Sequence, residues 1–339
     1  MPGLGGGTAV NGPVRIGVLG CADIARRRML PAMAASPEVT LAAVASRDAA
    51  RARRTARDFG CAAVHGYEAL LRRDDVDAVY LPLPAVLHAE WAGAALAAGK
   101  HVLAEKPLTT RAAGTRELVA SAGRAGLALM ENVMFVHHAQ HAVVRALLDD
   151  GALGELRLFQ AAFAVPRRPD GDIRLDPALG GGALWDTGVY PLRAALHLLN
   201  EPLSVVGAVL ARGRGDQVDT SGTALLRTAA GVAVQLSFGL DHAYRSVYEI
   251  WGSQGRLTVE PAFTPPADHA PRIVLERRGR AEEIVLDPDD QVRRTVEAFA
   301  AAVRSRAPAD PACVEQADLL DAIRVAAAGG TKGGSTGHG

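Results

Sequence analysis

The sequence has no excess of charge of either sign, since its 339 residues include 37 Lys or Arg and 37 Asp or Glu. A chain without a net charge has no general attraction for nucleic acid or for an anionic membrane surface. We therefore expect neither as a partner, and expect a small molecule instead.

Cysteine is also scarce. The three cysteines, Cys21, Cys61 and Cys313, are an odd number, lie far apart and lack the spacing of metal ligands. This pattern excludes a disulfide framework and indicates the reduced thiols of a cytosolic protein.

Long apolar runs are absent as well. No stretch approaches the roughly 18 uninterrupted apolar residues of a membrane-spanning helix. Residues 1–12 lack the basic start and apolar core of a signal peptide. We therefore expect a soluble, cytoplasmic protein. Residues 1–12 and 329–339 are rich in Gly, Ser and Thr, a composition that predicts mobile ends.

The length is sufficient for two domains, each with its own core. In residues 13–130, short apolar runs alternate with Ala-rich stretches of helical period. The predicted strands are VRIGVLG, VTLAAVA, DAVYLPL, HVLAEK and LALM, and the predicted helices lie near 23–35, 48–58, 88–98 and 111–125. Continuous apolar strands separated by helices indicate a doubly wound parallel sheet, covered on both faces.

Residues 131–328 have a different pattern, in which apolar runs follow one another with Gly-rich or polar turns and little helix between them. The predicted strands are RLFQAAFAV, SVVGAVLA, GTALLRT, VAVQLSFG, YEIWGS, RLTVE, RIVLERR and EEIVLD. They predict an α+β domain with a large, mostly antiparallel sheet. Two helices follow, one opening at Asp287 and Pro288 as cap and first helical residue, and one around VEQADLLDAIRVAAA at the domain boundary.

The stretch GVLGCADIA lies where a dinucleotide-binding turn is expected, between a strand and a helix. Gly20 fits the tight-turn position, Ala22 the position of close approach to the pyrophosphate, and Ala25 the packing position. Alanine at the second position departs from the usual glycine, so the backbone of Ala22 must avoid positive φ. An ordinary turn that binds nothing remains an equal alternative on these residues alone.

The end of the second predicted strand bears on the choice of cofactor. An NAD site places an acid there, whereas this chain has Ser46 and Arg47, which can bind the phosphate of NADP(H). The alternative is that Ser46 caps the helix beginning at Asp48 and Arg47 is a solvated charge.

Two motifs carry a family resemblance. Residues 81–108 contain His88, the run Gly99 to Val102 and the triplet Glu105, Lys106 and Pro107, and residues 180–192 read GGGALWDTGVYPL. Together they resemble the Gfo/Idh/MocA oxidoreductases. Within that family, the combination of GCADIA, the pair Ser46 and Arg47, and Tyr190 most resembles the 3-ketoreductases of dTDP-linked deoxysugars in antibiotic glycoside pathways. Two positions depart from the broad pattern: Ala85 replaces a common Asn, and Tyr190 a usual His.

The resemblance implies NADPH-dependent reduction of the C-3 ketone of a nucleotide-linked 2,6-dideoxyhexose. It also places the cofactor against residues at the ends of the first domain's strands. These are Gly20, Cys21, Ala22, Asp23, Ile24, Ser46, Arg47, Leu81, Pro82, Leu83, His88, Glu105 and Lys106.

Ketone reduction needs hydride at carbon and a proton at the developing alkoxide. Lys106 can polarise that oxygen, and the resemblance implies a cis bond before Pro107. Tyr190 is the candidate proton donor, and Asp186, four residues earlier, would share its helix face and orient Lys106 or bind a sugar hydroxyl. Pro191 can kink that helix. The alternatives are an exposed lysine and a half-buried tyrosine with a satisfied hydroxyl.

Other residues are candidates for substrate contact. His138 lies among His137 and His141, whose spacing suggests a metal, but no further ligand is evident and no metal is expected. Substrate contact or an ordinary helix surface are the alternatives for these histidines. Trp185 is a core residue or a wall of the cleft. Arg167, Arg168 and Arg174 bind a substrate pyrophosphate or are a solvated loop face.

Two other functions remain open: a dehydrogenase of free sugars or cyclitols, and a catalytically silent NADP(H) sensor. The wide antiparallel sheet predicts a homo-oligomer, dimer or tetramer, because an apolar face of that size is rarely left to solvent.

Overall fold

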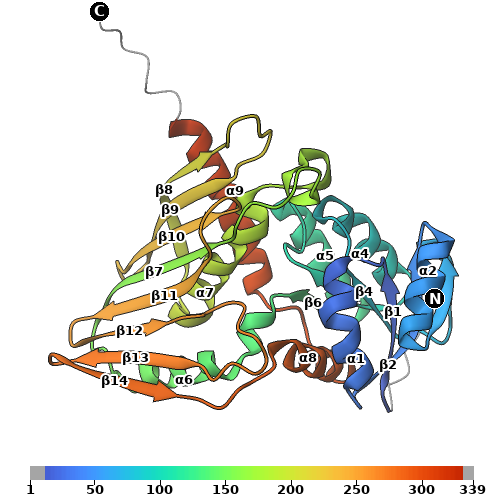
Figure 1. The fold of residues 1–339 in the computed structure, drawn as a ribbon, viewed down its shortest axis with the longest axis horizontal. Helices are drawn as coiled ribbons and strands as arrows, with labels where there is room; N and C mark the ends of the chain where they lie inside the picture. Colours follow the sequence, from blue (N-terminus) through green and yellow to red (C-terminus); the bar gives the residue numbers. More distant parts are fainter. Residues whose placement is uncertain (1–11, 331–339) are drawn as a thin grey trace, which may run out of the picture. The chain divides into compact units, whose positions relative to one another are not determined.

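The computed structural model of the protein describes residues 12–330, so the predicted mobile ends fall largely outside the described residues. The chain divides into two compact units (Figure 1). The first comprises residues up to 109 with 113–134 and 292–313, and the second comprises 110–112, 135–291 and the chain from 314. Residues 110–112, 131–134 and 292–313 thus group differently from the expected division into 13–130 and 131–328.

The first unit is built on a six-stranded parallel sheet in the order β3-β2-β1-β4-β5-β6. This is the doubly wound order, which reverses between β1 and β4 and opens a ligand crevice at the carboxyl ends of those strands. The strands are β1 (Val14–Leu19), β2 (Val39–Ser46), β3 (Ala62–His65), β4 (Ala78–Leu81), β5 (His101–Glu105) and β6 (Leu129–Asn132). The predicted fold of this domain is confirmed.

Helices cover both faces of this sheet, because two separate apolar clusters flank it. One cluster contains Ile16 and Val18 of β1 with Phe299, and the other contains Val79 of β4 with Leu96 and Leu118. The helices are the π-helix η1 (Ala25–Met29), α1 (Leu30–Ala35), α2 (Ala49–Phe59), α3 (Tyr67–Leu71), the 3-10 turn η2 (Ala85–Leu87), α4 (His88–Ala97), α5 (Ala112–Ala125) and α8 (Gln291–Ser305).

The start of α8 corrects one prediction. The helix begins at Gln291, so Asp287 and Pro288 precede it and are neither its cap nor its first residue. Asp289 instead uses Oδ2 to accept a hydrogen bond from the amide of Ala139 at 2.9 Å. The apolar side of α8, including Val296 and Phe299, then packs beside β1 in the first unit.

The second unit is built on an eight-stranded sheet in the order β14-β13-β12-β11-β7-β10-β9-β8. All neighbours are antiparallel except β7 and β10, which pair in parallel. The strands are β7 (Leu156–Ala164), β8 (Leu203–Ala211), β9 (Ser221–Thr228), β10 (Ala233–Gly239), β11 (Arg245–Gly252), β12 (Gly255–Val259), β13 (Arg272–Arg277) and β14 (Arg280–Val285). The predicted mostly antiparallel sheet is confirmed.

The remaining helical segments complete this unit. They are η3 (Met134–His137), α6 (Ala139–Asp149), the 3-10 turns η4 (Ile173–Leu175) and η5 (Pro177–Leu179), the π-helix η6 (Leu184–Gly188), α7 (Val189–Leu199) and α9 (Ala312–Gly330). Side chains alternate across the sheet: Phe159 and Phe163 of β7 are buried, whereas Val209 of β8 and Leu225 of β9 are exposed on the opposite face. Within residues 12–330, no helix is long and apolar enough to cross a membrane.

Candidate cofactor and substrate sites

The turn after β1 has the geometry of a dinucleotide-binding turn. Gly20 adopts φ +117°, and a Cβ there would lie 3.0 Å from Leu83, so only glycine fits without strain. The helix begins at Asp23, and the amide of Arg26 donates to the oxygen of Ala22 at 3.1 Å. Ala22 is not among the described residues with positive φ, so its methyl group is tolerated. The first helical amides after the turn are oriented to bind an anion.

The residues after β2 show how the next helix is capped. The amide of Asp48 donates to Oγ of Ser46 at 3.1 Å, and Asp48 Oδ1 accepts from the amides of Ala50 and Arg51. These bonds lower the pKa of Asp48. Asp48 is therefore the N-cap of α2, not Ser46, and Arg47 is exposed beside it.

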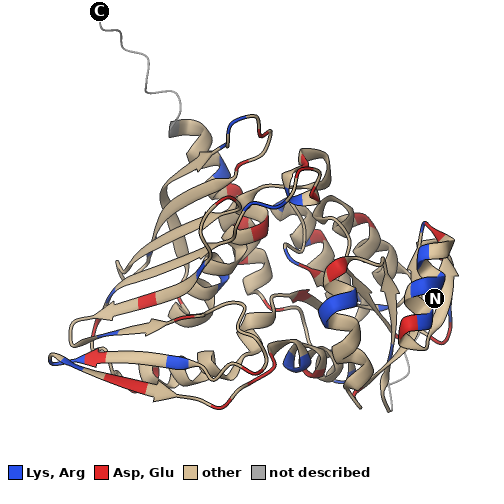
Figure 2. Cartoon of the chain, viewed as in Figure 1, with Lys and Arg blue, Asp and Glu red and all other residues tan. Residues whose placement is uncertain are grey.

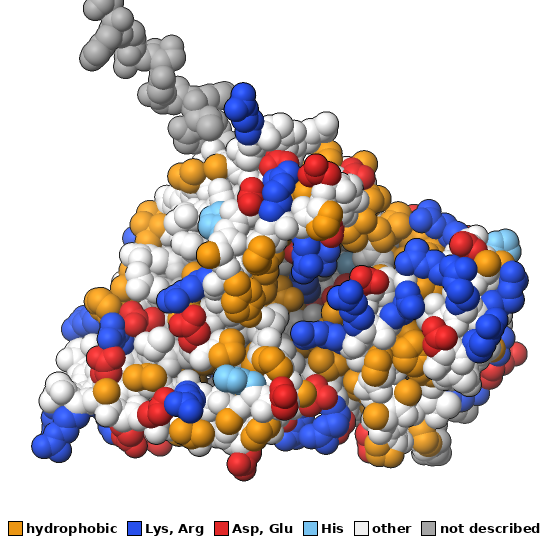
Figure 3. Space-filling view, in the orientation of Figure 1, with side chains coloured by type: hydrophobic (Ala, Val, Ile, Leu, Met, Phe, Trp, Pro, Cys, Tyr) orange, Lys and Arg blue, Asp and Glu red, His pale blue; other side chains and the backbone are white. Residues whose placement is uncertain are grey.

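Arg51 is a cofactor candidate that the sequence did not indicate. Its Nη2 donates to the main-chain oxygen of Cys21 at 2.8 Å, which brings a guanidinium from α2 to the turn after β1. Arginines also recur along α2, where parts of the ribbon are blue in Figure 2. On the face drawn in Figure 3, many Lys and Arg side chains gather over the first unit.

At the end of β5, Glu105 is held in place by two neighbouring strands. Its Oε1 accepts from the hydroxyl of Tyr80 on β4 and from Nδ2 of Asn132 on β6, both at 2.7 Å. Burial, with the nearby carboxylate, raises the pKa of Tyr80 well above its usual value. The sequence did not indicate this pair, because its residues are more than 20 positions from Glu105.

Lys106 and Pro107 follow directly, joined by the cis peptide bond that was predicted. The next amide, of Leu108, donates to Oε1 of Glu131 at 2.8 Å. On the β4 side, Leu81 is fully buried and belongs to the core. His88, expected among the cofactor contacts, is 1% exposed and contacts the backbone on either side of this site.

In the second unit, the glycine run before η6 permits a tight loop. A Cβ on Gly181 would lie 2.5 Å from the oxygen of Arg174, and one on Gly182, at φ +128°, would lie 2.5 Å from Asp219. Asp219 also binds the start of η6, because its Oδ2 accepts a hydrogen bond from the amide of Leu184 at 2.7 Å. Burial raises the pKa of Asp219. The glycines are therefore required to seat the start of η6.

Asp186 lies on η6 and pairs with an arginine from the preceding loop. Nε of Arg174 donates to Asp186 Oδ2 at 3.0 Å, and Nη1 of Arg174 also binds Asp172 at 3.1 Å. Asp186 and Tyr190 lie on a π-helix and on the α-helix that follows it, rather than on the single α-helix that was expected.

Tyr190 packs in an aromatic cluster of the second unit. Its ring centroid lies 4.4 Å from that of Phe163, 5.9 Å from Phe263 and 6.1 Å from Phe135. The side chain is half-buried. Trp185, on η6, is also half-buried, and the guanidinium of Arg324 lies 5.8 Å from its ring centroid.

Two candidates for substrate contact have structural partners. Arg167 binds Asp216 through both terminal nitrogens, at 3.0 and 2.9 Å, and lies 3.5 Å from Asp241. These carboxylates raise its pKa. His138 is buried, and its Nδ1 accepts from the amide of Gln140 at the start of α6.

His141 is in the core rather than on a helix surface. Its Nδ1 is 2.9 Å from the hydroxyl of Tyr248, and its Nε2 is 3.1 Å from the oxygen of Ala262. Burial lowers its pKa well below the usual value. The neutral ring satisfies both contacts by accepting from the tyrosine and donating to the carbonyl.

Most first-domain candidates thus lie at the carboxyl ends of β1, β2, β4 and β5, with His88 on α4. The second-domain candidates lie on η6, α7 and the loop before them, with His138 at the start of α6. A doubly wound nucleotide-binding unit followed by a unit with a large mixed sheet defines the class of two-domain dinucleotide-dependent oxidoreductases.

Comparison with known proteins narrows this class. Residues 14–133 match the family model for the oxidoreductase family with an NAD-binding Rossmann fold, and residues 141–258 match that for the GFO/IDH/MocA C-terminal domain. The chain belongs to the Gfo/Idh/MocA family.

Several relatives are similar over nearly the whole chain. The dTDP-3,4-didehydro-2,6-dideoxy-α-D-glucose 3-reductase of Saccharopolyspora spinosa is 52% identical over 320 residues, covering 92% of this chain and 96% of that protein. The crystal structure of KijD10, a 3-ketoreductase from Actinomadura kijaniata in complex with NADP and TDP-benzene, matches with a TM-score of 0.90 and 52% identity, covering 93% and 98%. A D-xylose 1-dehydrogenase (NADP(+)) of Haloferax volcanii is 39% identical over 85% of this chain and 89% of that protein.

Proposed function

We propose that the protein reduces the C-3 ketone of a dTDP-linked 3,4-diketo-2,6-dideoxyhexose, with NADPH as the reductant. The observation that carries the proposal is 52% identity to 3-reductases of that sugar over both units, with Lys106 at the end of β5 and Tyr190 at the start of α7. The chain carries both groups that the chemistry needs.

The residues present fit NADPH. The Gly20 turn leaves space that a Cβ would fill, and the helix amides after it suit a pyrophosphate. Ser46 and the exposed Arg47 would bind the 2′-phosphate, with Arg51 close to the turn. When bound, NADPH supplies the hydride. Arg47→Ala is expected to weaken binding of NADPH far more than binding of NADH, and equal effects would reject the phosphate contact.

The chain's own groups handle the charge and the proton. Lys106 donates a hydrogen bond to the C-3 oxygen and stabilises the negative charge that develops as hydride reaches C-3. Tyr190 then transfers its hydroxyl proton to that oxygen, so the ketone becomes a hydroxyl. The aromatic packing of Tyr190 holds its ring in place, which limits the conformations lost in reaching the reactive one.

The polar groups near Tyr190 are proposed to contact the sugar or its nucleotide. Asp186 is held in position by its ion pair with Arg174, and the half-buried ring of Trp185 lies on the same helix. A substrate pyrophosphate would have to compete with Asp216 and Asp241 for Arg167, and with Asp172 and Asp186 for Arg174.

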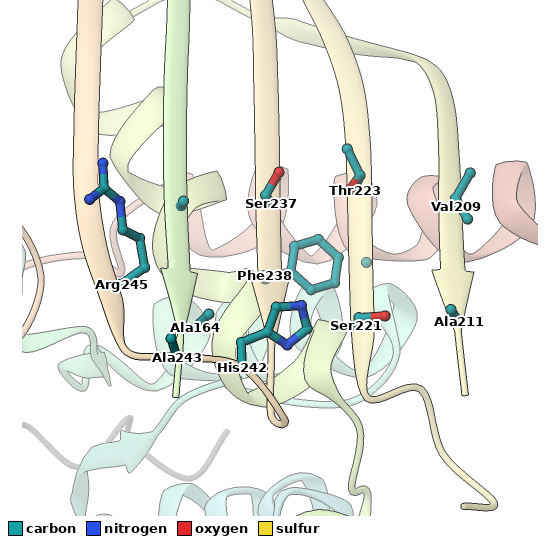
Figure 4. A pocket seen from close by; sticks show the side chains of 12 residues that line it. Ala164, Val209, Ala211, Ser221, Thr223, Ser237, Phe238, His242, Ala243 and Arg245 are labelled. Atoms are coloured by element: carbon teal, nitrogen blue, oxygen red, sulfur yellow. The ribbon is translucent and has the colours of Figure 1, made fainter. Parts of the chain in front are cut away.

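We further propose that the protein is a homo-oligomer through the open face of the eight-stranded sheet. That face carries Val206, Val209, Leu225 and Trp251, all exposed. It also contains an open cavity of about 470 Å³ lined largely by small side chains of β7 to β10, with Arg245 of β11 at one side and His242 beside Phe238 (Figure 4). Exposed apolar faces of this kind are usually covered by another subunit.

Product analysis tests the function. Purified protein, NADPH and dTDP-3,4-diketo-2,6-dideoxyhexose, generated in place by a partner dehydratase, should yield a sugar reduced at C-3 with one NADPH oxidised per product. Turnover of free sugars or cyclitols alone would favour the dehydrogenase alternative. Tight NADPH binding without oxidation of NADPH by any keto-sugar would favour the sensor.

A further inference from the structure

His88 has an unusual pair of hydrogen bonds for a buried histidine. It is the first residue of α4 and is 1% exposed. Its Nδ1 lies 2.9 Å from the main-chain oxygen of Pro107, and its Nε2 lies 2.8 Å from the main-chain oxygen of Leu83. The ring therefore bridges the segment after β4 and the segment after β5.

Both partners are carbonyl oxygens, which accept hydrogen bonds and cannot donate them. A neutral imidazole carries hydrogen on one nitrogen only, so it can make one of these two bonds. Both bonds form when each ring nitrogen carries a hydrogen. His141 is the contrasting case in the same chain, because one ring nitrogen faces a hydroxyl, which can donate to it, and only the other faces a carbonyl.

The two bridged segments are those that form the candidate cofactor site. Pro107 follows Lys106 directly, and the next amide, of Leu108, is held by Glu131. Leu83 lies against Gly20, where a Cβ would come within 3.0 Å of its side chain. The His88 ring thus links the backbone beside Lys106 to the residue that packs on the Gly20 turn.

We propose that His88 is a positioning residue, which donates from both ring nitrogens to hold the backbone beside Lys106 and thereby place the Lys106 ammonium. This replaces the expectation that His88 contacts the cofactor. The catalytic consequence rests on the proposed function, in which Lys106 polarises the ketone, but the placement of Lys106 does not.

The placement can be measured without turnover. The chain has three lysines, Lys100, Lys106 and Lys332, so the side-chain amine signals of lysine-labelled protein can be assigned with Lys106→Met. In His88→Gln, the glutamine side chain has a single nitrogen and cannot replace both ring donors. The Lys106 signal should therefore shift or broaden. The Lys100 signal should not move, because its Nζ donates to the oxygens of Arg73 and Val76. An unchanged Lys106 signal would overturn the proposal.

The protonation of the ring is read directly by ¹⁵N labelling of histidine. The signals absent from the His88→Gln spectrum belong to His88, and both of its nitrogens should have the shift of protonated nitrogen. A signal pair typical of a neutral ring would show that only one carbonyl is held.

Kinetics separate positioning from cofactor contact. His88→Gln should lower kcat about 10- to 100-fold through misplacement of Lys106, while Kd for NADP⁺ changes by less than about threefold. His88→Phe, with no donor, should lose more than His88→Gln. Weaker NADP⁺ binding with an unchanged kcat would instead make His88 a cofactor contact.

A matched control is available on β5, the strand directly before Lys106. His101, at the opposite end of β5, is buried and accepts from the amide of Ala128 at 2.9 Å. His101→Gln should leave kcat, Kd for NADP⁺ and the Lys106 signal unchanged, and its thermal midpoint reports the cost of losing a buried histidine. Should the wild type fail to reduce the dTDP-linked ketone, the proposed function fails, whereas the labelling and binding results still decide the role of His88.

Discussion

Nη2 of Arg51 donates to the main-chain oxygen of Cys21 at 2.8 Å, and this bond attaches α2 to the turn that would receive a pyrophosphate. Arg51→Met should therefore weaken NADPH binding, by about 1.5–3 kcal/mol if a charge-assisted bond to phosphate is lost as well. Titration calorimetry with NADPH and NADH measures the effect. Arg57→Met, in the last turn of the same helix, is the control and should bind both cofactors normally. An Arg51→Met protein with wild-type affinity would show that Arg51 has only a structural role.

Tyr190→Phe keeps the ring that packs on Phe163 and Phe263 and removes only the hydroxyl. We expect kcat to fall about 10²- to 10⁴-fold, because the proton donor is lost. Stopped-flow measurement of NADPH oxidation at saturating substrate tests this. Tyr244→Phe is the matched control, since that hydroxyl is exposed and binds Thr264. If Tyr190→Phe kept the wild-type rate, another group would deliver the proton.

Stability should fall on acidification through the titration of buried histidines. Burial lowers the pKa of His101, and lowers that of His141 well below its usual value. Their stabilising effect is complete above the unfolded-state pKa of about 6.5 and is lost as pH falls below it, because the unfolded chain then binds more protons. Each histidine contributes a slope of up to about 1.4 kcal/mol per pH unit.

Urea unfolding between pH 7.5 and 5 measures this slope. In His141→Gln, the pH dependence of the free energy of unfolding should decrease by the contribution of one histidine. The variant should also be less stable at every pH, because the contacts with Tyr248 and Ala262 change. A slope identical to that of the wild type would mean that His141 does not titrate in this window on unfolding.

Gly182→Ala should destabilise the start of η6. The new Cβ would lie 2.5 Å from Asp219 at a backbone φ of +128°, so both strain and a clash oppose it. A loss of about 1–3 kcal/mol in the free energy of unfolding is expected, with reduced activity because Asp186 and Tyr190 follow on η6 and α7. Gly207→Ala is the control, since nothing lies within 4 Å of its Cβ position. Equal stability of the two variants would contradict this account of the glycine run.

A charge on the open sheet face should disrupt the proposed oligomer. Light scattering after size exclusion should give a dimer or tetramer for the wild type and a smaller species for Leu225→Glu. Val325→Glu, at an exposed position on α9, should keep the wild-type mass. A wild type that is monomeric at micromolar concentration would reject the proposal.

Most of the fold could be predicted from apolar periodicity, because nearly every strand is a continuous or alternating apolar run. The strand β3 was missed, since AAVH is short and weakly apolar. The start of α8 was misplaced because the pair Asp287 and Pro288 has the sequence pattern of a helix start. In the structure the nearby carboxylate of Asp289 accepts a hydrogen bond from the amide of Ala139. The π-helices were also missed, because residue type alone does not distinguish their spacing from that of an α-helix.

The candidate site was only partly predictable, for a different reason. Motifs identify which side chains are present, but not which of them form ion pairs or hydrogen bonds with one another. Asp216 is far from Arg167 in sequence, and Tyr80 and Asn132 reach Glu105 only because β4 and β6 flank β5. Long-range pairing of this kind depends on the topology of the sheet.

The return of α8 to the first unit has a consequence for biosynthesis. The core beside β1 includes Val296, Phe299 and Val303, so residues 12–134 alone expose an apolar face. During translation this face stays uncovered until residues 135–291 have been synthesised and α8 follows them out of the ribosome. The amino-terminal unit is thus begun first but cannot be completed before residue 313 is synthesised, and a fragment ending near residue 134 should aggregate rather than bind cofactor.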